Sequence, residues 1–249
     1  MEYERIESKR ARLQALWASI PREARESFER SFDIKYTHNS TAIEGNTLTL
    51  VQIKAVLEDG LSVGGKTLRE IDEVVNHARA LSYVRERVAE GVPLCEEVAR
   101  DVHMILMENI LSGGIYRSVE ARISGAGFKP PSGNDMLYQI KDFFARLSER
   151  HDLNPIELAA WTHAEFVRIH PFVDGNGRTA RMLMNYQLMF YDFLPVSIAK
   201  EDRLPYFEAL EAYAVGGRLA SLAEMVATLE EDRLDEYLGI DPSLGRAGT

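Results

Sequence analysis

The sequence predicts an all-α protein, a bundle of helices with one short extended segment. Most of the 249-residue chain consists of charged, amphipathic segments that are typical of helices, and several of them open with a residue that caps helices well. Hydrophobic content of 45% and charged content of 27% are ordinary for a globular protein of this length, which is ample for a core. No internal repeat and no low-complexity block interrupts the pattern.

Capping residues mark the starts of several expected helices. Pro21 stands at the start of the second helix, and Thr47 and Thr67 can cap the third and fourth. Asn154 can cap the helix that has Pro155 at its first position. The expected helices cover, in chain order, residues 2–17, 21 to about 38, 47–57, 67–90, 95–109, 134–150, 155–169, 178–191, 202–215 and 219–238.

Residues 115–131 are the exception to the helical pattern. Within them, residues 119–124 alternate loosely between apolar and polar side chains, Gly125 and Gly127 follow, and a Pro-Pro pair at 130–131 ends the stretch. We expect a short strand or β-hairpin here, which would offer an exposed edge to another chain. The alternative is a loop with a strand-like twist.

Charge and cysteine content exclude several classes of protein. The formal net charge is −10, whereas general nucleic-acid or anionic-membrane binders need clustered positive charge. Cys95 is the one cysteine, so no internal disulfide is expected and a reducing compartment is favoured. Residues 1–12 lack the apolar core of a secretory signal, and no run approaches the length of a membrane span. The chain is expected to be cytoplasmic and to bind neither nucleic acid nor membrane.

The most informative stretch is His-Pro-Phe-Val-Asp-Gly-Asn-Gly-Arg-Thr-Ala-Arg, residues 170–181. Gly175 and Gly177 can adopt positive φ at little cost, which lets successive backbone N–H groups converge on an anion. A helix that starts directly after them would turn its N-terminal N–H groups toward the same anion. Arg178 and Arg181 are three residues apart, so on that helix both can face the loop.

The other side chains of this stretch suit phosphate chemistry. A histidine side chain ordinarily titrates near neutral pH, so His170 can accept a proton from a hydroxyl, and the Asp174 carboxylate is a hard oxygen ligand for Mg²⁺. Together the residues suggest attack of a hydroxyl on a phosphate of a magnesium nucleotide. The alternative is a capped helix hairpin with a solvated aspartate and two surface arginines, but a turn does not need all of these residues.

This stretch resembles the active-site motif of the Fic family, HxFx(D/E)GNGRxxR, with every defining position filled. The resemblance extends over roughly residues 95–213, including Gly-Ile-Tyr-Arg at 114–117 and Pro-Pro at 130–131. Fic proteins are helical, and most transfer AMP from ATP to a Ser, Thr or Tyr hydroxyl of a protein. The resemblance implies these roles: His170 as general base, Asp174 as ligand of Mg²⁺ or Mn²⁺, Gly175, Asn176 and Gly177 on the α- and β-phosphates, Arg178 supporting the phosphates and Arg181 on the γ-phosphate.

The resemblance also implies a flap and a base pocket. The flap, which aligns the target hydroxyl by strand-like pairing, would comprise Arg122, Ile123, Ser124 and Gly125. An apolar wall against adenine would comprise Tyr206, Phe207 and Leu210, for which ordinary core packing is the alternative. Several relatives carry an Asn one turn further on, where this chain has Ala214, so the nucleotide preference stays open.

A second motif precedes the first by more than a hundred residues. Gly45 suits the position after a helix, so Glu44 would lie at a helix C-terminus, where the helix dipole disfavours an anion unless a cation meets it. Ser40, Glu44 and Gly45 also resemble the Fic inhibitory motif, (S/T)xxxE(G/N), in which the glutamate pairs with the second arginine of the active-site motif, here Arg181. An exposed glutamate before a turn is the alternative without the resemblance.

We therefore expect a single helical Fic-like protein in three parts. They are an N-terminal helical region with the inhibitory motif (1–94), a catalytic core (95–215), and a C-terminal helix with a frayed tail (216–249). The expected activity is autoinhibited AMP transfer to a target protein and to the protein itself. Removal of AMP by the same site and nucleotide binding without turnover remain alternatives. Many relatives tune inhibition by dimerisation, which favours a homodimer.

Overall fold

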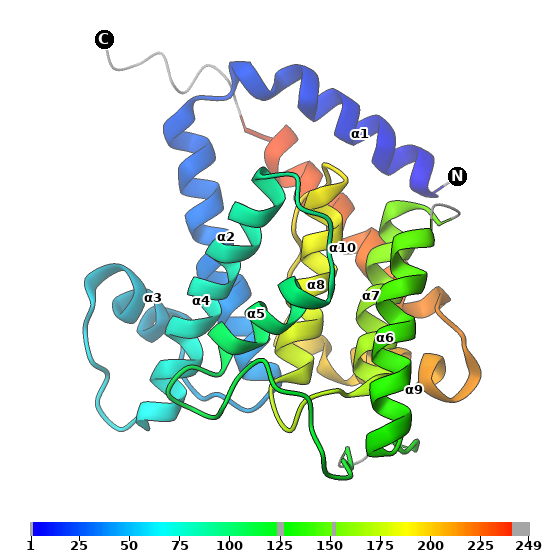
Figure 1. Ribbon diagram of the computed structural model, residues 1–249. Coiled ribbons are helices and arrows are strands. Elements are labelled where there is room, and N and C mark those ends of the chain that lie inside the picture. Colours follow the sequence, from blue (N-terminus) through cyan, green and yellow to red (C-terminus); the bar gives the residue numbers. More distant parts are fainter. Residues whose placement is uncertain (1, 124–126, 151–152, 241–249) are drawn as a thin grey trace.

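The computed structural model describes residues 2–123, 127–150 and 153–240, and these residues are helical with irregular connections (Figure 1). The predicted fold class is confirmed, because no strand occurs among the residues described. Two short 3₁₀ turns, Trp17–Ser19 and Lys200–Asp202, complement the helices. The helices are α1 (Glu2–Leu16), α2 (Arg22–Ile43), α3 (Leu50–Asp59), α4 (Leu68–Ala89), α5 (Glu96–Leu106), α6 (Gly133–Glu149), α7 (Pro155–Ile169), α8 (Asn176–Phe190), α9 (Arg203–Gly216) and α10 (Ala220–Leu238).

Helices α7 and α8 form the central antiparallel pair of the bundle. Figure 1 shows α8 in the middle of the molecule, where α4 and α5 pack against it, while α6, α9 and α10 pack against α7. Almost every side chain of α8 is buried, so along most of its length this helix has no face exposed to solvent. Helix α1 lies along α10, far along the chain from it. Helix α8 is therefore in contact with several helices at once.

Helix boundaries differ from the expected ones at three informative places. Helix α2 continues to Ile43, beyond the expected end near residue 38, and stops where Gly45 takes a φ of 103°. Helix α3 is capped by Thr49, whose hydroxyl accepts from the backbone N–H of Gln52, rather than by Thr47. Helix α8 begins two residues before the expected Arg178, so its first turn contains most of the glycine-rich loop.

The expected hairpin at 115–131 does not form in the part of that segment that the structure describes. One side chain satisfies two backbone carbonyls of the segment, because the Arg117 guanidinium donates to the carbonyl oxygens of Val119 and Pro131 as well as to that of His170. Ser124 and Gly125 of the expected flap lie outside the described residues, and the other two flap residues have no regular structure. The segment is a loop held by an arginine, which the alternation of side chains did not indicate.

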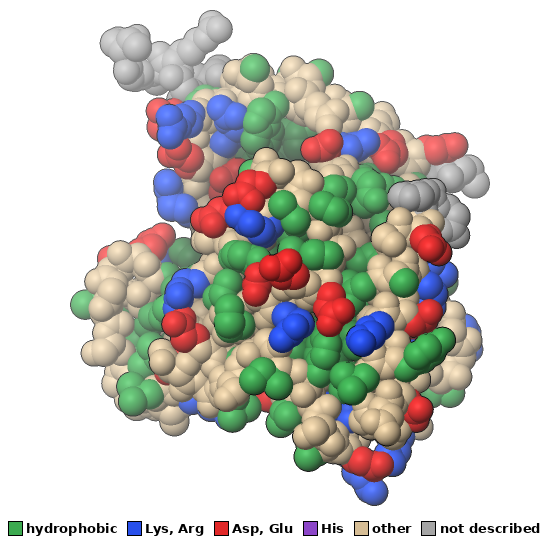
Figure 2. Space-filling view, in the orientation of Figure 1, with side chains coloured by type: hydrophobic (Ala, Val, Ile, Leu, Met, Phe, Trp, Pro, Cys, Tyr) green, Lys and Arg blue, Asp and Glu red, His purple; other side chains and the backbone are tan. Residues whose placement is uncertain are grey.

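The surface carries charges of both signs. Figure 2 shows Lys, Arg, Asp and Glu side chains interspersed with apolar ones over the face formed by α4, α5, α6 and α7. In the part of the chain that the structure covers, no helix is both long enough and apolar enough to cross a membrane. The strongly negative total charge is thus spread over a mixed surface and does not form a single acidic field on this face.

We expect Thr67→Ala to destabilise the start of α4. The Thr67 hydroxyl accepts from the Glu70 N–H, and the Glu70 carboxylate accepts from the Thr67 N–H, so the pair forms a capping box. Loss of such a cap costs about 1 kcal/mol, which urea unfolding would measure. Thr228→Ala is the matched control, because Thr228 is an exposed threonine within α10, and it should change stability by less than about 0.5 kcal/mol. Equal effects of the two substitutions would contradict the capping role.

Candidate active site

The loop between α7 and α8 brings the predicted motif residues together. Helix α7 ends at Ile169, and the C-cap residue His170 adopts the left-handed conformation with a φ of 53°. Gly175 adopts a φ of 75° as the N-cap of α8. Since non-glycine residues rarely adopt positive φ, the turn at His170 is held there by its surroundings. The chain thus leaves one helix at His170 and enters the next at Gly175, so the imidazole and the glycine-rich turn lie at the same helix junction.

Asn176 closes this loop on itself. Its side-chain Oδ1 accepts from the backbone N–H of Phe172 and its Nδ2 donates to the Phe172 carbonyl, both at 2.9 Å. The side chain is 2% exposed. The amide therefore serves the loop's own backbone, a role that the sequence did not indicate, while the expected contact of Asn176 with a phosphate stays a prediction.

His103 supports the loop from α5, and sequence reasoning missed it. Its ring stacks on Phe172 with the ring centroids 3.5 Å apart. The Gly114 N–H donates to His103 Nδ1 at 2.8 Å, so the ring proton is on Nε2, which donates to the Asp174 carbonyl at 3.0 Å. Burial lowers the pKa of His103 to about 4, so the neutral ring is the stable form at neutral pH. No motif could have indicated this role, because the partners are distant in sequence.

His170 presents a neutral imidazole. Burial lowers the pKa of His170 below its usual value. The backbone around it is fixed by Arg117, whose Nε donates to the His170 carbonyl at 2.8 Å and whose N–H donates to the Pro171 carbonyl at 2.9 Å. A neutral imidazole on a fixed backbone is what a proton acceptor at neutral pH requires.

Arg181 is the most fully engaged residue of the motif. Its side chain is 1% exposed. Its Nε donates to the Ser40 hydroxyl at 2.9 Å and its Nη2 to the Ser40 carbonyl at 2.7 Å. Nη2 also donates to Glu44 Oε1 at 2.8 Å, and Nη1 donates to the Tyr206 hydroxyl at 3.2 Å. The expected pairing of Glu44 with Arg181 is therefore present in the structure.

The end of α2 suits this contact electrostatically. The Ser40 carbonyl is one of the last four of α2, which have no partner within the helix and carry its partial negative charge. The same charge disfavours a carboxylate at Glu44, which is the C-cap residue. The Arg181 guanidinium offsets both, so the arginine stabilises the helix terminus while the terminus satisfies the buried arginine.

Gly177 is required for a close approach rather than for positive φ. It lies within the first turn of α8, and among the two glycines of the motif only Gly175 has a positive φ. A Cβ at Gly177 would lie 2.2 Å from Glu44 Oε1 and 3.2 Å from an Arg181 nitrogen. Gly177 thus does not use the positive φ that is open to glycine, and instead leaves room for the Glu44 carboxylate against the helix.

Arg178 is equally buried but less well satisfied. Its side chain is 2% exposed, and its guanidinium lies 3.4 Å from Glu73 Oε1 and 3.6 Å from Asp174 Oδ1. Two further residues complete this cluster, because Asn46 donates to Glu73 at 3.0 Å and Arg69 lies 2.5 Å from Asp174 Oδ2. Arg69 and Glu73, both on α4, are site neighbours that sequence reasoning missed.

Asp174 fits a cation that arrives with a ligand. Burial raises the pKa of the Asp174 carboxyl, but the Gly175 N–H and the guanidinium groups of Arg178 and Arg69 outweigh burial and hold that pKa below its usual value. Among the described residues there is no group of three acidic, histidine or cysteine side chains that could hold a metal ion. One ionised carboxylate suits Mg²⁺ that is otherwise bound by water and phosphate oxygens.

The expected adenine wall has a different visible role at one of its three positions. Tyr206 is 1% exposed and its hydroxyl lies 2.8 Å from His163 Nε2 as well as against Arg181, so it supports the arginine from α9. Leu210 is also buried, whereas Phe207 is 39% exposed. The contact of these residues with adenine stays a prediction.

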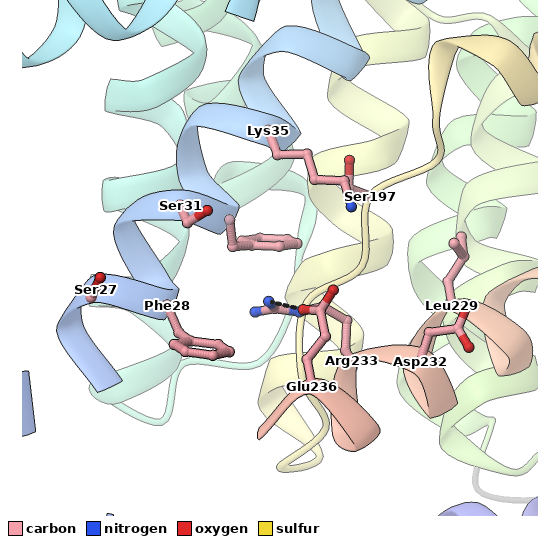
Figure 3. A pocket seen from close by; sticks show the side chains of 10 residues that line it. Ser27, Phe28, Ser31, Lys35, Ser197, Leu229, Asp232, Arg233 and Glu236 are labelled. Carbon is pink, nitrogen blue, oxygen red and sulfur yellow. Dashed lines mark hydrogen bonds and ion pairs between the residues drawn. The ribbon is translucent and has the colours of Figure 1, made fainter. Parts of the chain in front are cut away.

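A cavity of 530 Å³ lies elsewhere, between α2 and α10 (Figure 3). Lys35 of α2 and Arg233 of α10 line it, together with Ser197. None of residues 170–181 is among its lining. This cavity is therefore separate from the candidate active site.

Comparison with known proteins gives relatives along nearly the whole chain. The Fic/DOC family model matches residues 93–188. Protein adenylyltransferase Fic of Drosophila melanogaster is 32% identical over 239 residues, which are 94% of this chain and 48% of that protein. The protein of the same name from Drosophila erecta is also 32% identical over 239 residues, which are 94% of this chain and 47% of that protein. The chain thus spans about half the length of the curated relatives it matches.

Solved structures share the fold. Fic-1 of C. elegans superposes with a TM-score of 0.84 at 30% identity, covering 96% of this chain and 70% of that one. A glutamate-to-glycine variant of Fic-1 gives a TM-score of 0.80 at 31% identity, covering 96% and 71%. A Fic domain containing signaling protein from Bacteroides thetaiotaomicron gives a TM-score of 0.86 at 23% identity, covering 100% and 98%, which shows the fold alone.

Substitution of His103 should reveal its part in holding the loop. His103→Phe keeps the stacking on Phe172 but leaves the Gly114 N–H and the Asp174 carbonyl unpaired, which costs about 1–3 kcal/mol. His103→Gln can keep both hydrogen bonds and should cost less. Urea unfolding at neutral pH would measure both.

The pH dependence gives a second readout on the same variants. The folded pKa of His103 is below its unfolded value, so its contribution is complete above about pH 6.5 and is lost as the pH falls toward 4. The stability advantage of wild type over His103→Gln should therefore shrink between about pH 7.5 and about pH 5.5. A constant difference over that range would contradict the burial of a neutral ring.

Proposed function

Because the chain belongs to the Fic/DOC family, we propose that it is a protein adenylyltransferase. It would transfer AMP from ATP to a Ser, Thr or Tyr hydroxyl of a protein. One observation carries the proposal: a neutral imidazole, a helix N-terminus and two buried arginines converge on a single short loop. Pure nucleotide binding, the alternative, needs no imidazole at that place.

His170 is the base in this proposal. The target hydroxyl oxygen bonds to the α-phosphorus of ATP while the bond between that phosphorus and the oxygen bridging to the β-phosphate breaks, so pyrophosphate leaves. His170 takes the hydroxyl proton as the new bond forms. The depressed pKa of His170 supports this role, because the imidazole is unprotonated at neutral pH. Arg117 and Asn176 keep the loop rigid, which holds the imidazole at a fixed distance from the helix N-terminus.

The charges around the loop would hold the triphosphate. The first N–H groups of α8 have no partners within the helix and carry its partial positive charge, so they suit the α- and β-phosphates. Arg178 and Arg181 can add bidentate contacts. Asp174 is the residue that would hold a divalent cation, whose charge offsets that of the phosphate oxygens during transfer.

We propose that Glu44 holds this activity off at rest. The Glu44 carboxylate accepts a hydrogen bond from the Arg181 guanidinium that the γ-phosphate would otherwise take, and Ser40 and Tyr206 accept from other N–H groups of that guanidinium. A charge-assisted hydrogen bond of this kind contributes about 1.5–3 kcal/mol, enough to change ligand affinity by an order of magnitude or more. Release of Glu44 would restore the arginine to the nucleotide.

The remaining assignments follow from the same proposal. The protein would act on ATP with Mg²⁺ or Mn²⁺, on a target protein and on itself, and would work as a homodimer in the cytoplasm. The chain parts at 1–94, 95–215 and 216–249 would be the inhibitory region, the catalytic core and the C-terminal helix. The contact between Glu44 of the first part and Arg181 of the second supports the inhibitory assignment.

Transfer of label from ATP labelled in its α-phosphate tests the proposal. We expect little label on protein with wild type, strong labelling with Glu44→Gly, and none with Glu44→Gly/His170→Ala, because loss of a general base typically lowers rates by about 10²–10⁴-fold. Nucleotide binding should survive in the double variant. Equal labelling by wild type and Glu44→Gly would contradict the inhibitory role, and labelling without His170 would contradict the base. Bound ATP without label in any variant would instead favour removal of AMP from a modified protein.

A further inference from the structure

Arg69 occupies the carboxylate that the proposed function gives to a cation. It stands in the first turn of α4, and its guanidinium reaches the α7–α8 loop. Its Nη2 lies 2.5 Å from Asp174 Oδ2, and its Nε lies 3.3 Å from Glu73 Oε1. Within residues 170–181, Asp174 is the one acidic residue. The positively charged guanidinium of Arg69 thus pairs with the one negatively charged side chain of this loop.

The two carboxylate oxygens of Asp174 have different partners. Oδ1 accepts from the Gly175 N–H at 2.6 Å and lies 3.6 Å from Arg178, so it belongs to the internal structure of the loop. Oδ2 contacts Arg69, which comes from outside the loop. A cation could therefore take Oδ2 by displacing Arg69 without disturbing the contacts that shape the turn.

Arg69 is held in reach of Asp174 by the start of its own helix. The first turn of α4 is fixed by the Thr67–Glu70 capping box, and the Glu70 backbone carbonyl accepts from Asn46. Glu73 offers the guanidinium a second acceptor one turn along the same helix. If Arg69 left Asp174, it would keep this partner, so its departure would leave no charge unpaired.

We propose that Arg69 is an internal competitor for the cation-binding oxygen of Asp174, a second restraint on the nucleotide site that acts separately from Glu44. The proposal rests on the proposed function, since it takes Asp174 as the cation ligand. Competition for the cation and a role in phosphate binding predict opposite effects of removing Arg69. A competitor weakens cation binding, so its removal strengthens it, whereas removal of a phosphate ligand weakens nucleotide binding.

The direct test measures Mn²⁺ bound in the presence of ADP, by the loss of the free Mn²⁺ signal in electron paramagnetic resonance. We expect Arg69→Gln to bind Mn²⁺ about two- to five-fold more tightly than its parent, the range for an ion pair between half-exposed groups. The side chains of Arg69 and Asp174 are 55% and 37% exposed. The gain should appear both in wild type and in Glu44→Gly, and the affinity for ADP without metal should not fall.

Two control variants make the outcome specific. Arg79 is the matched control, because its side chain is also 55% exposed on α4 but pairs with Glu108 rather than with the loop. Arg79→Gln should leave Mn²⁺ affinity unchanged, and Asp174→Asn should abolish most of the binding. Unchanged or weaker Mn²⁺ binding in Arg69→Gln, with Asp174→Asn still deleterious, would overturn the competition while leaving the proposed function intact. Unimpaired binding in Asp174→Asn would overturn the cation assignment itself, and the competition with it.

Discussion

The burial of the Arg181 guanidinium is the constraint on which the site depends. A charge that is almost fully removed from water must meet acceptors on every side, because an unpaired buried charge is strongly destabilising. Those acceptors come from the end of α2 and from α9, which are far apart in sequence. The position of α2 against α8, the missing side chain at Gly177 and the buried Tyr206 hydroxyl all serve this one guanidinium.

That requirement would also couple the proposed inhibition to the fold. At rest Arg181 is satisfied entirely by the protein, so a phosphate must replace protein acceptors rather than water. Arg178 is in the opposite state: it is equally buried, but two of its nitrogens have no hydrogen-bond partner and its carboxylates stand more than 3 Å away. One arginine of the motif is therefore saturated and the other is short of acceptors. In the proposed function, Arg178 would therefore have N–H groups free to bind a phosphate, whereas those of Arg181 already bond to Ser40 and Glu44.

Local features of the sequence predicted the fold and the motif well. The helix at Pro155–Ile169 was predicted to the residue because Asn154 and Pro155 mark its start, and the chemistry of residues 170–181 is visible because it is contiguous. The contact of Glu44 with Arg181 followed from family resemblance and not from any local pattern. His103, Arg69 and Glu73 gave no signal, since the residues of the site that they contact lie far away in the sequence. In the described part of residues 115–131 the hairpin is absent, and the buried Arg117 side chain satisfies two backbone carbonyls there, those of Val119 and Pro131.

The central claim is that Glu44 denies Arg181 to the γ-phosphate, and the ratio of ATP to ADP affinity tests it most directly. Calorimetry with His170→Ala would avoid turnover, because the base is absent while the arginines remain. In that protein ATP and ADP should bind with similar affinity, and adding Glu44→Gly should strengthen ATP binding by about ten-fold or more while leaving ADP nearly unchanged. The same ratio in both proteins would show that Arg181 does not meet the γ-phosphate, and the account of the inhibition would fail.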